Sequence, residues 1–357
     1  MMNPNDRLAA FIRLGKIVSY LQSTYNHDNS LVLNPNELKA TEELSVAISS
    51  AIQNNPWFTV QNMDQAINGL SVLLQEEALE RWFGQYNCRE KQKINRVGVV
   101  MAGNIPAVGF HDFLCVLITG NIFVGKLATN DRFLLPAIAQ VLIAINNRFI
   151  PFISFTTERL TGFDAVIATG STNTSRYFEY YFGKYPNIIR SNRNSVAILT
   201  GDETSEELQL LATDVFSYFG LGCRNVSLIF VPEEYNFGNL LEIFSDKPEL
   251  FNHSKYFNNY EYNKAILLIN SIKHFDNNSV LLKEDASISS AVSMLHYQFY
   301  NNLNEVNQWI VLNKDKIQCV VSKSPEINGS IPLGKSQYPD VTDYADGIDT
   351  MDFLLNL

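Results

Sequence analysis

The turn around Cys223 has the clearest potential for chemistry in the sequence. Cys223 follows Gly220-Leu221-Gly222 and precedes Arg224, between a predicted helix and a predicted strand. A cysteine on such a tight turn is exposed, its neighbouring backbone amides can hold an oxyanion, and a cation beside it favours the thiolate. The alternative is a buried structural cysteine, which is the commoner fate of single cysteines. The remaining cysteines lack a neighbouring glycine and are expected to be structural: Cys88, Cys115 and Cys319.

Two further polar residues follow predicted strands. Asn104 lies in the segment Ala102-Gly103-Asn104-Ile105-Pro106, at the end of the apolar run 97–102. Its amide can donate a hydrogen bond to an oxyanion, or it can simply cap the helix that follows. Lys126 ends the apolar run 122–126 and can meet a ribose hydroxyl or a phosphate. The alternative is a surface lysine whose apolar stem lies along the protein.

A third segment, Thr169-Gly170-Ser171-Thr172-Asn173-Thr174, opens a predicted helix. Small residues with free backbone amides at a helix N-terminus form an anion site, so Gly170, Ser171 and Thr172 are candidates for binding a phosphate group. Ser and Thr also favour the N-cap position for purely structural reasons. The motif G-x-G-x-x-G follows none of these predicted strands, so the ordinary Rossmann fingerprint is absent.

The histidines and cysteines show no metal-ligand spacing, and we expect no metal. His111 precedes Asp112, but adjacent residues on a helix point apart, so a catalytic pair between them is not expected. His111 is kept as a candidate for touching the substrate, with a structural role as the alternative. Three other histidines are expected to be structural: His253, His274 and His296.

The pattern of apolar residues predicts an α/β chain. Apolar positions at helical spacing indicate an N-terminal helical segment over residues 1–92. Short apolar runs that alternate with helical stretches over residues 93–194 indicate a parallel sheet wound with helices, which binds ligands beyond the carboxyl ends of its strands. Residues 195–330 form a further α/β unit, and residues 331–357 a C-terminal segment. The expected strands are 97–102, 122–126, 151–155, 165–168, 187–189, 196–199, 226–231, 293–300 and 317–321.

Two other segments carry specific expectations. The stretch Asn252 to Asn263, rich in Asn and Tyr, is predicted to be an irregular surface. Tyr344 to Leu355 is predicted to be a closing amphipathic helix.

Composition excludes several classes of protein. The chain has 357 residues with a net charge of −10 and a pI near 5.1, so nucleic acid is not an expected partner, because phosphate binding needs a basic face. No apolar run reaches the roughly 18 residues that span a bilayer, and the first residues lack the basic start and apolar core of a signal peptide. Four scattered cysteines do not form a disulfide scaffold. We expect a reducing, cytoplasmic compartment and no membrane insertion.

Taken in order, these segments resemble the aldehyde dehydrogenase superfamily. Gly103-Asn104-Ile105-Pro106 is similar to its Trp-Asn-Phe-Pro segment, and Lys126-Leu127-Ala128 to its Lys-Pro-Ala/Ser. Thr169-Gly170-Ser171-Thr172 is similar to its Phe-Thr-Gly-Ser-Thr loop, and Gly222-Cys223 to its Gly-Gln-x-Cys nucleophile. Among relatives, the LuxC-like acyl-CoA reductases match best, on residues 103–112 and on the tail Tyr344-Ala345-Asp346-Gly347. The resemblance covers about residues 95–357.

The resemblance implies a fold, a reaction and a set of roles. The fold would be aldehyde-dehydrogenase-like, with a cofactor-binding domain over residues 93–194 and a catalytic domain over residues 195–330. Cys223 would attack an acyl thioester, and Asn104 with the Cys223 amide would form the oxyanion hole. Lys126 would meet the adenosine ribose or its phosphate. The residues implied at the pyrophosphate are Gly170 and Ser171, next to Thr172, and those near the substrate are His111 and Gly222.

The sequence also departs from the hydrolytic relatives. They carry Glu-Leu-Gly-Gly before the first strand of the catalytic domain, whereas the matching stretch here, Arg190 to Asn194, holds no carboxylate. Glu284 or Asp285 could still supply a slow base. The late Glu-x-Phe-Gly-Pro segment, which holds the nicotinamide ribose, has its nearest counterpart in Pro332-Leu333-Gly334-Lys335.

The expected function is therefore NAD(P)H-dependent reduction of an acyl-CoA to the aldehyde, and a fatty acyl-CoA is the expected substrate. NADPH is the expected cofactor, with NADH as the alternative. The partner would be an acyl-CoA or acyl-carrier thioester, and a homo-oligomer is compatible with the sequence. Two alternatives stay open: an acyl-phosphate reductase of the same fold, and a non-catalytic scaffold that only binds acyl groups.

Overall fold

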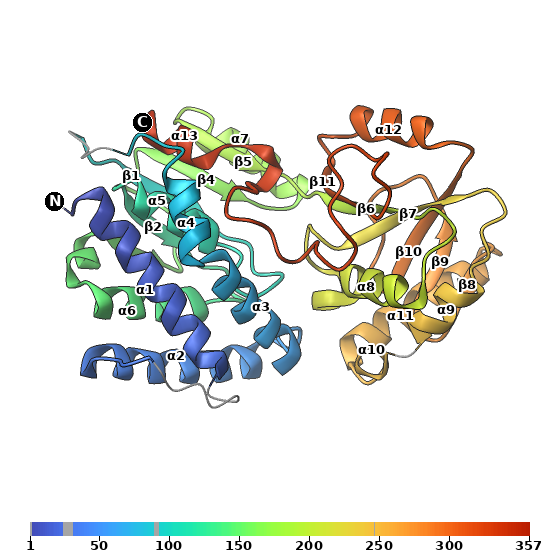
Figure 1. The fold of residues 1–357 in the computed structure, drawn as a ribbon, viewed down its shortest axis with the longest axis horizontal. Helices are drawn as coiled ribbons and strands as arrows, with labels where there is room; N and C mark the ends of the chain where they lie inside the picture. Colours follow the sequence, from blue (N-terminus) through green and yellow to red (C-terminus); the bar gives the residue numbers. More distant parts are fainter. Residues whose placement is uncertain (1, 24–30, 89–92, 246) are drawn as a thin grey trace. The chain divides into compact units, whose positions relative to one another are not determined.

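The computed structural model describes residues 2–23, 31–88, 93–245 and 247–357. The chain divides into two compact units (Figure 1). The first unit comprises Met1–Asn192 and Tyr338–Leu357, and the second unit comprises Arg193–Gln337. The second unit is therefore inserted into the first, which receives the last segment of the chain.

A five-stranded parallel sheet forms the centre of the first unit, with the strand order β3-β2-β1-β4-β5. Its outward order reverses between β1 and β4, and ligands bind at such a switch point in open α/β sheets. Val100, which ends β1, pairs with Lys126 of β2 and with Ala168 of β4, so the three strands end at the same level. The strands are β1 (Arg96–Val100), β2 (Ile122–Lys126), β3 (Ile153–Thr156), β4 (Ala165–Thr169) and β5 (Asn187–Arg190).

Helices cover both faces of this sheet. Strands buried on both faces are continuous apolar runs, and alternate residues of β1 lie on opposite sides: Val97 and Val99 face the larger core, while Val100 faces a smaller cluster with Phe178 and Phe182 of α7. The helices of the first unit are α1 (Pro4–Ser23), α2 (Pro35–Asn54), α3 (Val60–Leu73), α4 (Glu76–Phe83), α5 (Phe110–Ile118), α6 (Leu134–Ile145), α7 (Thr172–Phe182) and α13 (Thr350–Leu355), with short 3-10 helices at Asn147–Phe152 and Ala345–Gly347.

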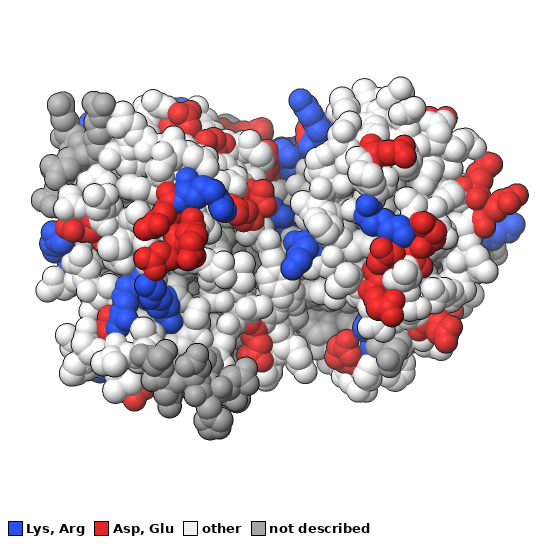
Figure 2. Space-filling model, in the orientation of Figure 1, with Lys and Arg blue, Asp and Glu red and all other residues white. Residues whose placement is uncertain are grey.

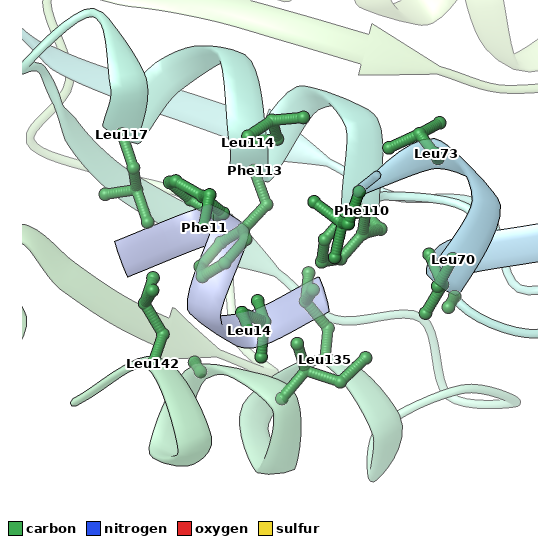
Figure 3. Close-up of a cluster of buried hydrophobic side chains, with 14 of the residues drawn as sticks. Phe11, Leu14, Leu70, Leu73, Phe110, Phe113, Leu114, Leu117, Leu135 and Leu142 are labelled. Carbon is green, nitrogen blue, oxygen red and sulfur yellow. The ribbon is translucent and has the colours of Figure 1, made fainter. Parts of the chain in front are cut away.

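The N-terminal helices share the core of the first unit. Figure 3 shows Phe11 and Leu14 of α1 between the side chains of α5 and those of α6. Phe11 meets Phe113 edge to face, with ring centroids 6.3 Å apart, and both side chains are fully buried. Burying a large apolar side chain contributes about 1.5–3 kcal/mol. The four helices before residue 84 are thus built into the body that carries β1.

A six-stranded sheet forms the centre of the second unit, with the order β11-β6-β7-β10-β9-β8. Only the short edge strand β8 is antiparallel to its neighbour. The strands are β6 (Asn194–Ile198), β7 (Val226–Pro232), β8 (Phe275–Asp276), β9 (Leu281–Glu284), β10 (Met294–Tyr300) and β11 (Ile317–Ser322). The helices are α8 (Ser205–Phe216), α9 (Gly238–Ser245), α10 (Pro248–Phe251), α11 (Ser254–Ile269) and α12 (Leu303–Leu312), with a short 3-10 segment at Ser217–Gly220.

Two expectations about secondary structure were wrong. The stretch Asn252 to Asn263 is not irregular, because α11 begins at Ser254 behind the N-cap His253. The closing helix is shorter than predicted: α13 begins at Thr350, behind the N-cap Asp349. Asp346 and Gly347 have positive φ angles of 60° and 67°, which no regular helix accommodates,.

Charged side chains are sparse on the face of the molecule that Figure 2 shows. On the face shown in Figure 2, Lys and Arg lie in small groups beside Asp and Glu, and most of the area is uncharged. None of the helices in the described part of the chain has the length and apolar character needed to cross a bilayer.

Candidate functional site

Asn104 lies at the carboxyl edge of the sheet in the first unit. The segment after β1 is a loop with a bend at Asn104, and the Asn104 side chain is exposed. Gly109, not Asn104, is the N-cap residue of α5, so capping of that helix does not explain the asparagine. Gly103 lets the loop pass close to the segment that follows β2, because a Cβ there would lie 2.7 Å from the Ala128 Cβ.

Asp131 holds this loop and was missed by the sequence reasoning. Its Oδ2 accepts a hydrogen bond of 2.7 Å from the Ala107 amide, and the Asp131 side chain is almost fully buried. Ala107 has a φ of 58°, a left-handed conformation that L residues rarely adopt,. Burial raises the pKa of Asp131 to about 6, against the influence of the Ala107 and Leu134 amides, which lower it. The position of Asp131 shortly after Lys126 was the signal that the sequence offered for this residue. The Ala107 amide that it binds is 24 positions away in the sequence.

Lys126 ends β2 at the same edge. Its Nζ donates hydrogen bonds to the carbonyl oxygens of Thr157 and Glu158, at 3.1 and 3.0 Å. The ammonium group therefore lies against the loop that follows β3. The side chain is neither a fully exposed surface lysine nor a buried one.

The segment after β4 forms a capped helix N-terminus. The Ser171 Oγ accepts a hydrogen bond from the Thr174 amide at 3.3 Å, so Ser171 is the N-cap residue of α7, and Thr172 begins the helix. Gly170 is required by packing, because a Cβ there would lie 2.9 Å from Phe178 and 3.0 Å from Thr174. Ser171 therefore has the structural role of an N-cap residue. The first backbone amides of α7 follow it at the switch point of the sheet, where β4 lies beside β1.

His111 and Asp112 have separate partners in the first unit. The His111 Nε2 lies 2.9 Å from the Val341 carbonyl oxygen, so the imidazole contacts the C-terminal segment. Asp112 receives a 2.7 Å hydrogen bond from Arg190, and both side chains are buried. Arg190 also donates to the Thr350 hydroxyl at 2.9 Å, which ties β5 and α5 to α13.

Cys223 lies in the second unit, on the turn before β7. Of the four cysteines only Cys223 is exposed, whereas Gly222 beside it is buried. The residues before the turn, Tyr218 and Phe219, are buried with φ angles of 52° and 58°. Left-handed backbone costs roughly 1–2 kcal/mol per non-glycine residue. Strained backbone of this kind is concentrated at functional sites.

Burial disfavours the thiolate at two of the other three cysteines. Burial raises the pKa of the Cys115 thiol well above its ordinary value. Burial also raises the pKa of Cys319, although Arg224 and Ser195 act to lower it. Cys88 is half-buried. The described residues contain no group of three His, Cys, Asp or Glu side chains that could hold a metal ion.

The first unit thus brings Asn104, Lys126 and Gly170 to the ends of three adjacent strands, with Ser171 and Thr172 at the helix that follows. His111 lies on α5 and contacts the C-terminal segment instead. Cys223 and Gly222 belong to the second unit.

Solved structures with a similar fold support this reading of the architecture. An indole-3-acetaldehyde dehydrogenase in complex with NAD+ has a TM-score of 0.63 at 13% identity, covering 96% of this chain and 80% of that one. Aldehyde dehydrogenase 21 from Physcomitrella patens, in complex with the reaction product succinate, has a TM-score of 0.62 at 13% identity, with coverages of 100% and 84%. The chain has the aldehyde dehydrogenase fold.

A third structure with the aldehyde dehydrogenase fold gives the same result. The NAD-dependent benzaldehyde dehydrogenase from Corynebacterium glutamicum has a TM-score of 0.63 at 12% identity, covering 93% of this chain and 81% of that one. No protein-family model matches the sequence, and no curated protein sequence does either. The predicted fold class, an aldehyde-dehydrogenase-like α/β protein with parallel sheets, is therefore confirmed at the level of the fold.

Proposed function

We propose that the protein is a LuxC-like acyl-CoA reductase, which reduces a fatty acyl-CoA thioester to the aldehyde with NADPH through an acyl-cysteine at Cys223. The observation that carries the proposal is the exposure of Cys223 alone among the four cysteines, on a turn with strained backbone before it. An exposed thiol is accessible for attack on a thioester, as a nucleophilic cysteine must be, and the neighbouring Arg224 guanidinium donates to the Ser336 carbonyl oxygen at 3.3 Å.

The surroundings of the first sheet fit a nicotinamide dinucleotide. The loop after β1 and the N-terminus of α7 flank the switch point of the strand order, where dinucleotides bind in such sheets,. Gly170 lets the β4–α7 connection pack against Phe178 and Thr174 of α7. The first backbone amides of α7 suit a pyrophosphate. Lys126 would contact the adenosine ribose or its 2′-phosphate. The dinucleotide supplies hydride.

The residues of the chain would divide the reduction into two steps. The Cys223 thiolate attacks the thioester carbonyl, the carbon–sulfur bond to CoA breaks, and CoA leaves as a thiol after taking up a proton. Hydride addition to the acyl-cysteine would then give a thiohemiacetal oxyanion, whose carbon–sulfur bond breaks to release the aldehyde and restore the Cys223 thiolate. Both steps pass through an oxyanion, which Asn104 and the Cys223 amide would stabilise.

The missing base favours reduction over hydrolysis. Between Arg190 and Asn194 there is no carboxylate, and Arg190 itself is occupied by Asp112. Asp285 of the second unit has its pKa lowered by the hydrogen bond from Lys283, which makes it a weak base,. Water would therefore attack the acyl-cysteine slowly, and the acyl group would wait for hydride or a thiol.

Intact-mass spectrometry tests the proposal. With decanoyl-CoA and no cofactor, the wild-type protein should gain one decanoyl group, located on Cys223 by peptide mapping. Addition of NADPH should discharge it and release decanal. Cys223→Ser should abolish both events, whereas the matched variant Cys88→Ser should retain them.

Four other outcomes would overturn the proposal. An acyl group on Cys88, Cys115 or Cys319, or aldehyde production without an acylated Cys223, would exclude the proposed nucleophile. Acylation by decanoyl phosphate but not by decanoyl-CoA would instead indicate an acyl-phosphate reductase. Binding of decanoyl-CoA without any acylation would leave a non-catalytic acyl-binding protein.

A further inference from the structure

We propose that Asn225 is the positioning residue of the Cys223 turn, with Ser195 supporting the same turn from β6. The inference rests on the proposed role of Cys223 as nucleophile and adds the residues that fix its place. Neither residue stands out in the sequence, because Asn and Ser are common in turns. Their role follows from the hydrogen bonds that each makes within the second unit.

Asn225 closes the turn with both its side chain and its backbone. Its side-chain Oδ1 accepts a 2.8 Å hydrogen bond from the Gly222 backbone amide, and the Asn225 backbone amide donates to the Gly222 carbonyl oxygen at 3.1 Å. Its Nδ2 donates to the carbonyl oxygens of Asp214, Val215 and Ser217, at 3.1, 3.3 and 2.8 Å. The side chain is 1% exposed. These carbonyls end α8, where backbone acceptors have no partner within the helix.

The same contacts enclose the strained backbone before Cys223. Tyr218, Phe219 and Gly220 have consecutive positive φ angles of 52°, 58° and 75°. Asn225 binds Ser217 on one side of this segment and Gly222 on the other. One side chain therefore fixes the backbone before and after the left-handed residues. The direction in which the backbone runs on to Cys223 is fixed as a result.

Ser195 of β6 forms hydrogen bonds with the backbone of the turn. Its Oγ donates to the Cys223 carbonyl oxygen at 3.1 Å and accepts from the Cys319 amide at 3.2 Å, while its own amide donates to the Asn225 carbonyl at 3.1 Å. The registers of β6 with β7 and of β6 with β11 both shift beside Ser195. Such irregularities occur next to active sites, where they redirect a side chain.

A fixed turn matters because the reacting atoms must be held closely. Displacement by about 1 Å can cost about 10²-fold in rate. Asn225 and Ser195 bind the peptide groups on either side of Cys223, so together they set where its thiol and its amide point. Neither side chain needs to touch the substrate.

The test compares Asn225→Ala and Ser195→Ala with Asn263→Ala, a matched control. Asn263 is a buried asparagine of the same unit whose Nδ2 donates to the Val292 carbonyl instead. Hydrogen–deuterium exchange of the peptide covering 217–225 should accelerate in both test variants and stay unchanged in the control. Alkylation of native wild-type Cys223 by iodoacetamide should be faster than in the urea-unfolded chain, and Asn225→Ala should lower it to the unfolded rate.

Steady-state kinetics complete the test. For decanoyl-CoA reduction, kcat and kcat/KM should fall together by about 10²-fold in Asn225→Ala, and less in Ser195→Ala, which retains the Asn225 contacts. Unchanged exchange of the 217–225 peptide in a folded Asn225→Ala protein would overturn the inference. If that variant does not fold, Asn225→Ser takes its place, and unchanged exchange of the same peptide in the folded Asn225→Ser protein overturns the inference equally. Unchanged exchange in Ser195→Ala overturns the part assigned to Ser195. A wild-type protein whose Cys223 is never acylated would refute the proposed function, while the exchange experiment would still decide the role of Asn225.

Discussion

The buried carboxylate of Asp131 predicts a pH dependence in the stability of the first unit. Burial raises its pKa from 3.8 to about 6, and a change of one in pKa corresponds to about 1.4 kcal/mol. The rise thus corresponds to about 3 kcal/mol. Because the folded chain binds this proton more tightly than the unfolded chain, the stabilisation is complete below a pH of about 4 and is lost as the pH rises through about 6.

Asp131→Asn isolates this contribution, because asparagine keeps the size of the side chain and does not ionise. Going from pH 4 to pH 8, the free energy of unfolding of the variant should rise by about 3 kcal/mol relative to that of the wild type. Urea unfolding followed by tryptophan fluorescence provides the measurement. A Trp309→Phe background confines the signal to the first unit, which contains Trp57 and Trp82.

Glu37→Gln serves as the control with the opposite sign. The hydrogen bond from Arg13 lowers the pKa of Glu37, so its contribution is present above the ordinary carboxyl pKa and lost as the pH falls through the folded value. A flat difference between wild type and Asp131→Asn from pH 4 to pH 8 would refute the reasoning. A difference with the same sign as that of Glu37→Gln would do so equally.

Three other substitutions probe the candidate residues of the first unit. Asn104→Ala should lower turnover by about 10²–10³-fold, the usual cost of losing one oxyanion donor, with an unchanged melting temperature; a lower melting temperature at an unchanged rate would indicate a structural role. Lys126→Ala should raise the Kd of NADPH more than that of NADH in a fluorescence titration, and equal losses would remove the argument for a 2′-phosphate contact. Asp112→Ala removes the carboxylate that hydrogen-bonds to the buried Arg190 and should lower the free energy of urea unfolding by about 3–5 kcal/mol; replacing both residues with apolar ones should restore much of it.

Sequence patterns located the strands well where the middle of a strand is buried on both faces. The run Ile122 to Lys126 was predicted with its observed bounds, because apolar residues on both faces leave no ambiguity of period,. The same reasoning failed at α11, whose buried residues include Tyr256, Tyr260 and Leu267. Tyrosines bury their rings while they count as polar in a pattern, and the many asparagines lowered the apparent helix propensity.

The candidate site was predictable only in part, because hydrogen bonds between distant residues leave no local pattern. Asn104 and Cys223 were proposed as site residues from their neighbours along the chain. Asp131 was not, since its significance comes from the Ala107 amide, a contact that only the fold creates. Asn225 lies two positions after Cys223, yet its carbonyl partners end a helix several residues earlier.

The insertion of the second unit has a consequence for the order in which a ribosome delivers the parts of the protein. Met351 and Leu354 of α13 are fully buried in the core of the first unit, and Thr350 bonds to Arg190. These residues emerge only after all of residues 193–337, which takes about seven to thirty seconds at about 5–20 residues per second. Throughout that interval the nascent first unit exposes the apolar surface that α13 will cover, and exposed surface of this kind is prone to aggregation, whereas the second unit can fold as an uninterrupted stretch of chain.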